Sequence, residues 1–105
     1  MTAKAEAERI VNAIMRPVEE NGLSSWERLV LVFIVLSRFD NHGRCVRARM
    51  TGSAADISAS LSMPTAKTNC VLETLKTKGV LHEHENGGRR WWRISVAAIT
   101  RRRKG

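Results

Sequence analysis

The sequence predicts an α+β fold: a mainly α-helical domain that carries one small antiparallel β-hairpin. Apolar residues recur at helical spacing over several segments, and one helix-like segment ends at Gly79. Directly after that glycine come two short runs joined by Asn86-Gly87-Gly88, a sequence that accepts the backbone angles of a tight hairpin turn. These observations together predict the fold class.

The N-terminal part of the chain predicts two helices. Residues 2–15 contain good helix formers with one apolar stripe, and Pro17 ends that helix. Ser24 and Glu27 stand at capping-box spacing, which predicts a second helix over residues 26–39. The centre of this second helix is apolar on every face, a pattern typical of a helix that is buried on all sides.

The remaining residues complete a single domain. We assign residues 1–100 to one domain, made of an N-terminal helix (1–22) and a core (23–100). A basic tail at 101–105 follows and is predicted to be disordered. The elements predicted after residue 39 are a basic strand at 45–50, helices at 54–61 and 65–78, hairpin strands at 80–85 and 89–95, and a last helical turn at 96–99.

The charge of the chain is divided unevenly along its length. Eighteen Lys and Arg against ten Asp and Glu give a net charge of +8. Residues 1–43 carry five basic and six acidic side chains, whereas residues 44–105 carry thirteen basic and four acidic. Most of the basic residues are arginines, whose planar guanidinium suits phosphates and base edges. This division predicts a polyanionic partner for the second part, with a solvated surface as the alternative.

The predicted order of elements is helix, helix, strand, helix, helix and hairpin, which is the layout of a winged helix-turn-helix. Residues 51–81 resemble the MarR-like members of that superfamily, in which a short turn leads into a recognition helix. The matching residues are Leu61-Ser62-Met63-Pro64 at the turn and Leu75-Lys76-Thr77-Lys78-Gly79-Val80 at the end of the helix. Residues 27–45 resemble the compact helix-turn-helix domains of phage and plasmid replication or regulatory proteins. The resemblance covers about residues 26–95.

This resemblance implies binding to double-stranded DNA. It places a recognition helix (65–78) in the major groove and a basic wing (80–95) on the backbone. The positions that it turns toward the bases are Thr65, Ala66, Lys67 and Asn69. The residues that we expect at the DNA backbone are Arg47, Arg49, Arg89, Arg90, Arg93, Arg101, Arg102 and Arg103. Strand alternation puts Arg90, Trp92 and Ile94 on one face of the wing, with Trp92 and Ile94 in the core.

The chain departs from the family pattern in the recognition helix. Pro64 stands where the family prefers Ser or Thr, and Thr68 takes a position that is normally apolar. The exposed face of the helix has no arginine, although arginine is the commonest base-reading residue. Contact with the DNA backbone is therefore more strongly predicted than recognition of specific bases.

Other kinds of chemistry have weaker signals. The Trp91-Trp92 pair resembles the stacking residues of single-strand binders, but one member of such a pair is more often a core residue. His82 and His84 share one strand face, without a Cys-x-x-Cys pair to strengthen a metal site. The sequence has no phosphate-cradling glycine loop and no supported Ser/His/Asp arrangement. We therefore predict no enzymatic activity, no metal and no cofactor.

The leading functional expectation is a cytoplasmic transcriptional regulator, such as a phage or plasmid repressor, that acts as a homodimer. We expect the dimer to form through residues 3–15 and 26–39. The longest apolar run is too short to span a bilayer, and the two distant cysteines predict reduced thiols. Three alternatives stay open: a replication or partition accessory protein, a winged-helix inhibitor or adaptor with a protein partner, and an architectural DNA binder that works through charge alone.

Overall fold

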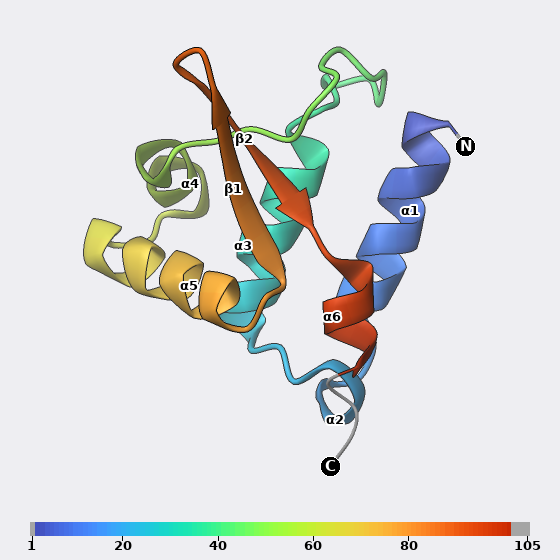
Figure 1. Cartoon of the computed structure of the whole chain (residues 1–105), viewed down its shortest axis with the longest axis vertical. Helices are drawn as coiled ribbons and strands as arrows, with labels where there is room; N and C mark the ends of the chain where they lie inside the picture. Colours follow the sequence, from blue (N-terminus) through green and yellow to red (C-terminus); the bar gives the residue numbers. More distant parts are fainter. Residues whose placement is uncertain (1, 102–105) are drawn as a thin grey trace.

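The structure is a computed structural model that describes the backbone of residues 2–101 and the side chains of residues 2–100. It is mainly helical with one two-stranded antiparallel hairpin in the described residues, as expected for the coarse α+β class that the sequence predicts. Figure 1 shows α1 and the α4–α5 pair at opposite sides of the molecule, with the hairpin and α3 between them. The elements are α1 (Ala3–Ile14), α2 (Val18–Asn21), α3 (Ser25–Leu36), α4 (Ala54–Leu61), α5 (Thr65–Thr77), β1 (Leu81–Asn86), β2 (Arg89–Ile94) and α6 (Val96–Arg101). None of these helices has the length and apolar character that a membrane span requires.

The N-terminal segment holds two helices, because Pro17 separates α1 from the single turn of α2. Asn21 closes the junction between them and is almost fully buried. Its Nδ2 donates to the carbonyl oxygens of Ala13 and Ile14 at 3.0 and 2.9 Å, while its Oδ1 accepts from the backbone N–H of Leu23 at 3.0 Å. This side chain therefore satisfies carbonyl groups that the end of α1 leaves open.

The capping box of α3 forms as predicted. Ser24 Oγ accepts from the backbone N–H of Glu27, and Glu27 Oε1 accepts from that of Ser24. The helix ends at Leu36, three residues earlier than predicted. Within one copy of the chain the helix is not buried on all sides, because Leu29 and Leu36 are 48% and 53% exposed. Helices α1, α4 and α5 pack against α3, and they leave Leu29 and Leu36 uncovered.

Residues 45–50 do not form the predicted strand. Within this segment only isolated bridges occur, from Cys45 to Phe39 and from Met50 to Trp92. The backbone N–H groups of residues 46 and 47 bond instead to the carbonyl of Arg38, at 2.7 and 3.1 Å. The segment therefore folds back on the end of α3, and only Met50 lies beside β2, on the edge opposite β1.

The end of α5 directs the chain into the hairpin. Val71 and Leu75 are buried on the inner face of α5, as predicted. Gly79 then adopts a left-handed φ of 77°, and the backbone N–H of Val80 donates to the carbonyl of Leu75 at 3.1 Å. This arrangement is the Schellman motif, which both ends the helix and turns the chain sharply.

The hairpin pairs in register from Leu81 opposite Ile94 to Asn86 opposite Arg89. Trp92 and Ile94 are buried, so the predicted core face of the wing is confirmed. After the hairpin, α6 continues to Arg101 and packs against α1 and α2, so it is longer than the predicted turn at 96–99. Arg101 thus belongs to a helix in place of the predicted tail, and residues 102–105 lie outside the described residues.

Candidate nucleic-acid interface

Helices α4 and α5 pack against each other across a short turn at residues 62–64. Ser53 and Asp56 form a capping box that starts α4. Ser62 takes a left-handed φ of 53° in the turn, and Pro64 occupies the N-cap position of α5. Pro64 supplies no side-chain hydrogen bond to α5, so the departure noted in the sequence leaves the first N–H groups of this helix without that acceptor.

The four predicted base-reading residues lie together on the exposed part of α5. Thr65, Ala66, Lys67 and Asn69 are all exposed in its first two turns. Thr68 is buried, and its hydroxyl donates to the carbonyl of Pro64 at 3.2 Å, so the helix itself satisfies this polar group in a normally apolar position. Lys67 is the only basic residue among the exposed positions of α5, and Glu73 is acidic, so this surface carries little net charge.

A polar groove of about 390 Å³ separates α5 from the hairpin, and Asn69 lines it. Lys76 bridges the two elements, with its Nζ 3.2 Å from a carboxylate oxygen of Glu73 and 3.2 Å from one of Glu83. Burial alone would lower the pKa of Lys76, but the hydrogen bonds and charges of these carboxylates raise it. Arg90 adds ion pairs to Glu83 and Glu85 at 3.6 and 3.9 Å. The predicted backbone-contact residue Arg90 is therefore already paired with acids.

The structure brings other predicted backbone-contact residues together in a second groove, which we call the arginine groove. It has a volume of about 460 Å³ and lies between the loop at residues 47–51 and the hairpin. Figure 1 shows this loop, in green, and the tip of the hairpin at the same end of the molecule. The described residues that line the groove include no acidic side chain; they are Arg47, Ala48, Arg49, Thr51, Asn86, Arg89, Arg90 and Trp91.

Trp91 organises one wall of the arginine groove. The Cζ atom of Arg49 lies 4.0 Å from the centroid of the Trp91 ring. On the facing strand, His84 stacks on the same tryptophan with centroids 5.6 Å apart and an interplanar angle of 14°. The Nε2 atom of His84 is buried, and among the described residues it has no hydrogen-bond partner. Trp91 therefore lies in a cationic and aromatic surface and not in the core.

The remaining predicted backbone residues do not join this groove. Arg93 lines a small cavity between α1 and the hairpin, together with Glu6, Arg9 and Arg38. Only the backbone of Arg101 is described, at the end of α6, and Arg102 and Arg103 lie outside the described residues. The arginine groove thus brings together Arg47, Arg49, Arg89 and Arg90. Arg93 lies apart from them, in the cavity between α1 and the hairpin.

The sequence did not predict the contact between Arg49 and Trp91. The two residues are distant in the chain, and the predicted strand at 45–50 gave no reason to place them together. Within the hairpin, Nε2 of His82 donates to the carbonyl oxygen of Gly79 at 3.0 Å, while His84 contacts Trp91. No group of three or more His, Cys, Asp or Glu that could hold a metal occurs in the part of the chain that the structure describes.

Comparison of the chain with protein-family models, with curated proteins and with solved structures finds no match.

Proposed function

We propose that the protein binds double-stranded DNA as a transcriptional regulator of the winged helix-turn-helix type. In this proposal α5 enters the major groove, where Asn69 pairs with adenine and Lys67 meets a base or a phosphate, and the hairpin lies on the backbone. The order of α3, α4, α5 and hairpin supports the proposal. The isolated bridge between Met50 and Trp92 supports it too, because Met50 lies beside β2 at the position that a third strand of the sheet would occupy.

The observation that carries the proposal is the location of the arginines that lack acidic partners. Arg16, Arg38, Arg44 and Arg90 each form an ion pair with a carboxylate. Arg47, Arg49 and Arg89, which all line the arginine groove, form no ion pair with a described residue. Three arginines outside the groove, Arg9, Arg28 and Arg93, form none either. Several cations held around one groove repel one another unless an anion neutralises them. The phosphates of a DNA backbone supply that charge.

Fluorescence anisotropy at several salt concentrations tests this proposal. The ligands are the duplex upstream of the protein's own gene and a scrambled duplex of the same length. The variant Arg47→Gln/Arg49→Gln/Arg89→Gln removes three charges from the groove. The control, Arg9→Gln/Arg16→Gln, removes two exposed charges, one from α1 and one from the segment between α1 and α2, so the changes in slope are compared per charge removed.

We expect the groove variant to lower the slope of log K against log salt by about 0.9 for each lost phosphate contact, and the α1 control to leave it nearly unchanged. Lys67→Ala/Asn69→Ala should reduce the preference for the upstream duplex while leaving most of the salt slope in place. Equal losses in the groove variant and the α1 control would contradict a defined interface. They would favour an architectural binder that works through charge alone.

We further propose that two copies pair through α1 and α3, so that two α5 helices read neighbouring half-sites. The open face of α3 presents Leu29 and Leu36, and Leu36 also lines an apolar groove of about 750 Å³ against α1. Lys4 and Glu8 of α1 and Asp40 border this groove with both signs of charge, which suits a second copy of the same surface. The arginine groove stays free in this arrangement because other residues line it.

A protein-binding inhibitor or adaptor is a second candidate, favoured by the nearly neutral exposed surface of α5. This function predicts weak DNA binding without preference between the two duplexes. It also predicts that the triple arginine variant keeps its biological activity. A replication or partition accessory protein shares the DNA-binding chemistry, and a footprint at an origin in place of a promoter would favour it.

A further inference from the structure

The arginine groove contains a guanidinium, that of Arg49, which lies over an aromatic ring of the protein. The Cζ atom of Arg49 lies over the Trp91 ring, 4.0 Å from its centroid, and the side chain has no ion pair or hydrogen bond with another described residue. A guanidinium that stacks on a ring keeps its N–H donors in its own plane, directed outward around its edge. Arg49 therefore presents a set of oriented donors that the protein does not use.

Hydrogen bonds of neighbouring residues fix both partners of this contact. The backbone N–H of Trp92 donates to the carbonyl of Met50 at 2.8 Å, and Nε1 of Trp92 donates to the carbonyl of Gly52 at 2.8 Å. These bonds attach the segment just after Arg49 to the strand that carries Trp91. The position of Arg49 over the ring thus follows from the fold and not from a flexible loop alone.

We infer that Arg49, oriented by Trp91, binds a backbone phosphate of DNA in the arginine groove, with Trp91 as a positioning residue. This inference rests on the proposed function and names the ligand group and the residue that orients it. The planar fork of arginine matches two phosphate oxygens, and Arg47 and Arg89 add charge from the loop and from the hairpin. A stacked base is a poorer fit, because Arg49 already covers the Trp91 ring.

The phosphate contact lies on a different face of the hairpin from α5. Trp91 and its cross-strand partner His84 share one face, whereas Trp92 and its partner Glu83 share the other and line the polar groove against α5. The contact at Arg49 therefore adds to any contact that α5 makes. Its loss should weaken binding to different DNA sequences alike, while base reading by α5 stays intact.

A double-mutant cycle tests the inference, with duplex affinity measured as a function of salt. The variants are Arg49→Ala, Trp91→Leu, the combination of both, and Trp91→Phe as the conservative replacement. Trp91→Leu leaves every charge in place, so electrostatic attraction alone predicts no effect. Thermal melting by circular dichroism establishes whether each variant is folded. If Trp91→Leu is not folded, Trp91→Phe still tests the inference.

We expect Trp91→Leu to weaken duplex binding by about two- to fivefold, the range that corresponds to one exposed cation–π contact. Trp91→Phe should recover most of this loss. The double variant should bind like Arg49→Ala alone, because Trp91 acts through Arg49. Additive losses, or wild-type affinity in Trp91→Leu, would overturn the inference while leaving the proposed function standing.

Two other results separate the possible failures. A larger loss for Trp91→Leu on single-stranded oligothymidine than on duplex would place a base on the ring and overturn the phosphate assignment. If the wild-type protein shows no binding to either duplex at low salt, the proposed function fails and the inference falls with it.

Discussion

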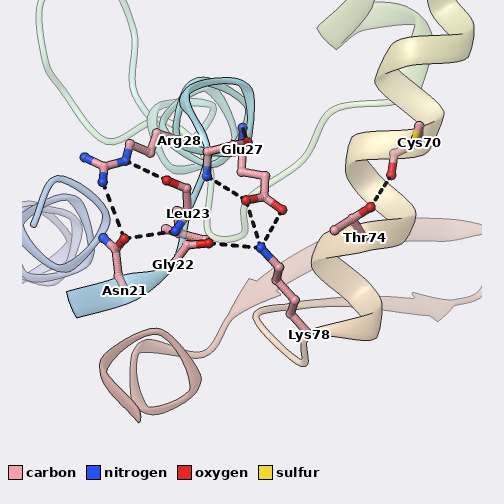
Figure 2. A network of polar contacts seen from close by, with 9 residues as sticks. Asn21, Gly22, Leu23, Glu27, Arg28, Cys70, Thr74 and Lys78 are labelled. Carbon is pink, nitrogen blue, oxygen red and sulfur yellow. Dashed lines mark hydrogen bonds and ion pairs between the residues drawn. The ribbon is translucent and has the colours of Figure 1, made fainter. Parts of the chain in front are cut away.

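Lys78, at the end of α5, binds the buried carboxylate that caps α3. Its Nζ lies 2.9 Å from both Oε1 and Oε2 of Glu27 and 3.1 Å from the carbonyl oxygen of Gly22, as Figure 2 shows. Glu27 is only 5% exposed, and the same carboxylate accepts the backbone N–H of Ser24 at 2.7 Å. This contact fastens the C-terminal end of α5 to the first turn of α3, and so sets α5 against the core.

Replacing Lys78 with methionine should lower the free energy of unfolding by about 2–3 kcal/mol, because Glu27 would stay buried without its cation. Urea denaturation at neutral pH measures the change. Lys76→Met is the matched control: it removes a cation of the same helix whose carboxylate partners are more exposed, so the cost should stay below about 1 kcal/mol. Equal losses in the two variants would contradict a special role for the Lys78 contact.

The contact between Glu27 and Lys78 also predicts a pH dependence of stability. Burial would raise the pKa of Glu27, but hydrogen bonds from Lys78 and Ser24 and the charge of Lys78 together lower it. Because the folded pKa is depressed, the stabilisation is complete above the unfolded value of about 4.5 and is lost as the pH falls through the folded pKa.

Glu27→Gln should therefore lose less stability than the wild type between about pH 5 and about pH 3. Urea denaturation at several pH values in that range gives the comparison. Asp40 also has a lowered pKa, mainly through the hydrogen bond from the backbone of Arg44, and it is present in both proteins. The difference between them therefore isolates Glu27, and parallel curves would show that its ionisation does not contribute.

Gly52 should resist substitution because of its backbone conformation. Its φ of 129° is a region that L side chains rarely adopt, and its carbonyl accepts the indole N–H of Trp92. A Cβ atom there would meet Phe33 at 3.5 Å, an ordinary contact, so the expected cost of Gly52→Ala, about 2 kcal/mol, is strain and not crowding. Gly43→Ala, at a φ of 78° and in open space, should cost about 1 kcal/mol in the same denaturation assay. An equal or smaller cost at Gly52 would mean that the loop relaxes freely.

Elements with boundaries set by local chemistry can be predicted from this sequence. The capping box at Ser24, the glycine stop at Gly79 and the turn at residues 86–88 all act within a few residues, and each lies where predicted. The segment 45–50 has the alternation of a strand, but the carbonyl of Arg38 takes two of its N–H groups. That competition depends on how α3 ends in space, which no local pattern encodes.

The candidate interface was predictable as a set of residues but not as an arrangement. Charge, strand alternation and the resemblance to the winged helix-turn-helix proteins together predict Arg47, Arg49 and Arg89 as backbone contacts, and the arginine groove brings them together. Whether such a cation has an acidic partner depends on residues that the fold brings close to it. Arg90 forms ion pairs with two carboxylates of β1, and Arg93 lies toward α1, although all three arginines are predicted as backbone contacts and Arg93 is predicted on the same face as Arg89.

The proposed dimer predicts that charge on the open face of α3 separates the two copies. The wild-type protein should sediment as a dimer at micromolar concentration, and Leu29→Glu/Leu36→Glu should sediment as a monomer. Both leucines are about half exposed, so the double variant should keep its thermal stability. Val46→Glu, in the loop beyond α3 and 57% exposed, is the control and should remain dimeric.

On a palindromic duplex the monomeric variant should lose the two-fold footprint and bind each half-site independently, because the second α5 helix would no longer be held one duplex turn away. A wild-type protein that sediments as a monomer would contradict the dimer, and one that stays dimeric after both substitutions would place the interface on another surface.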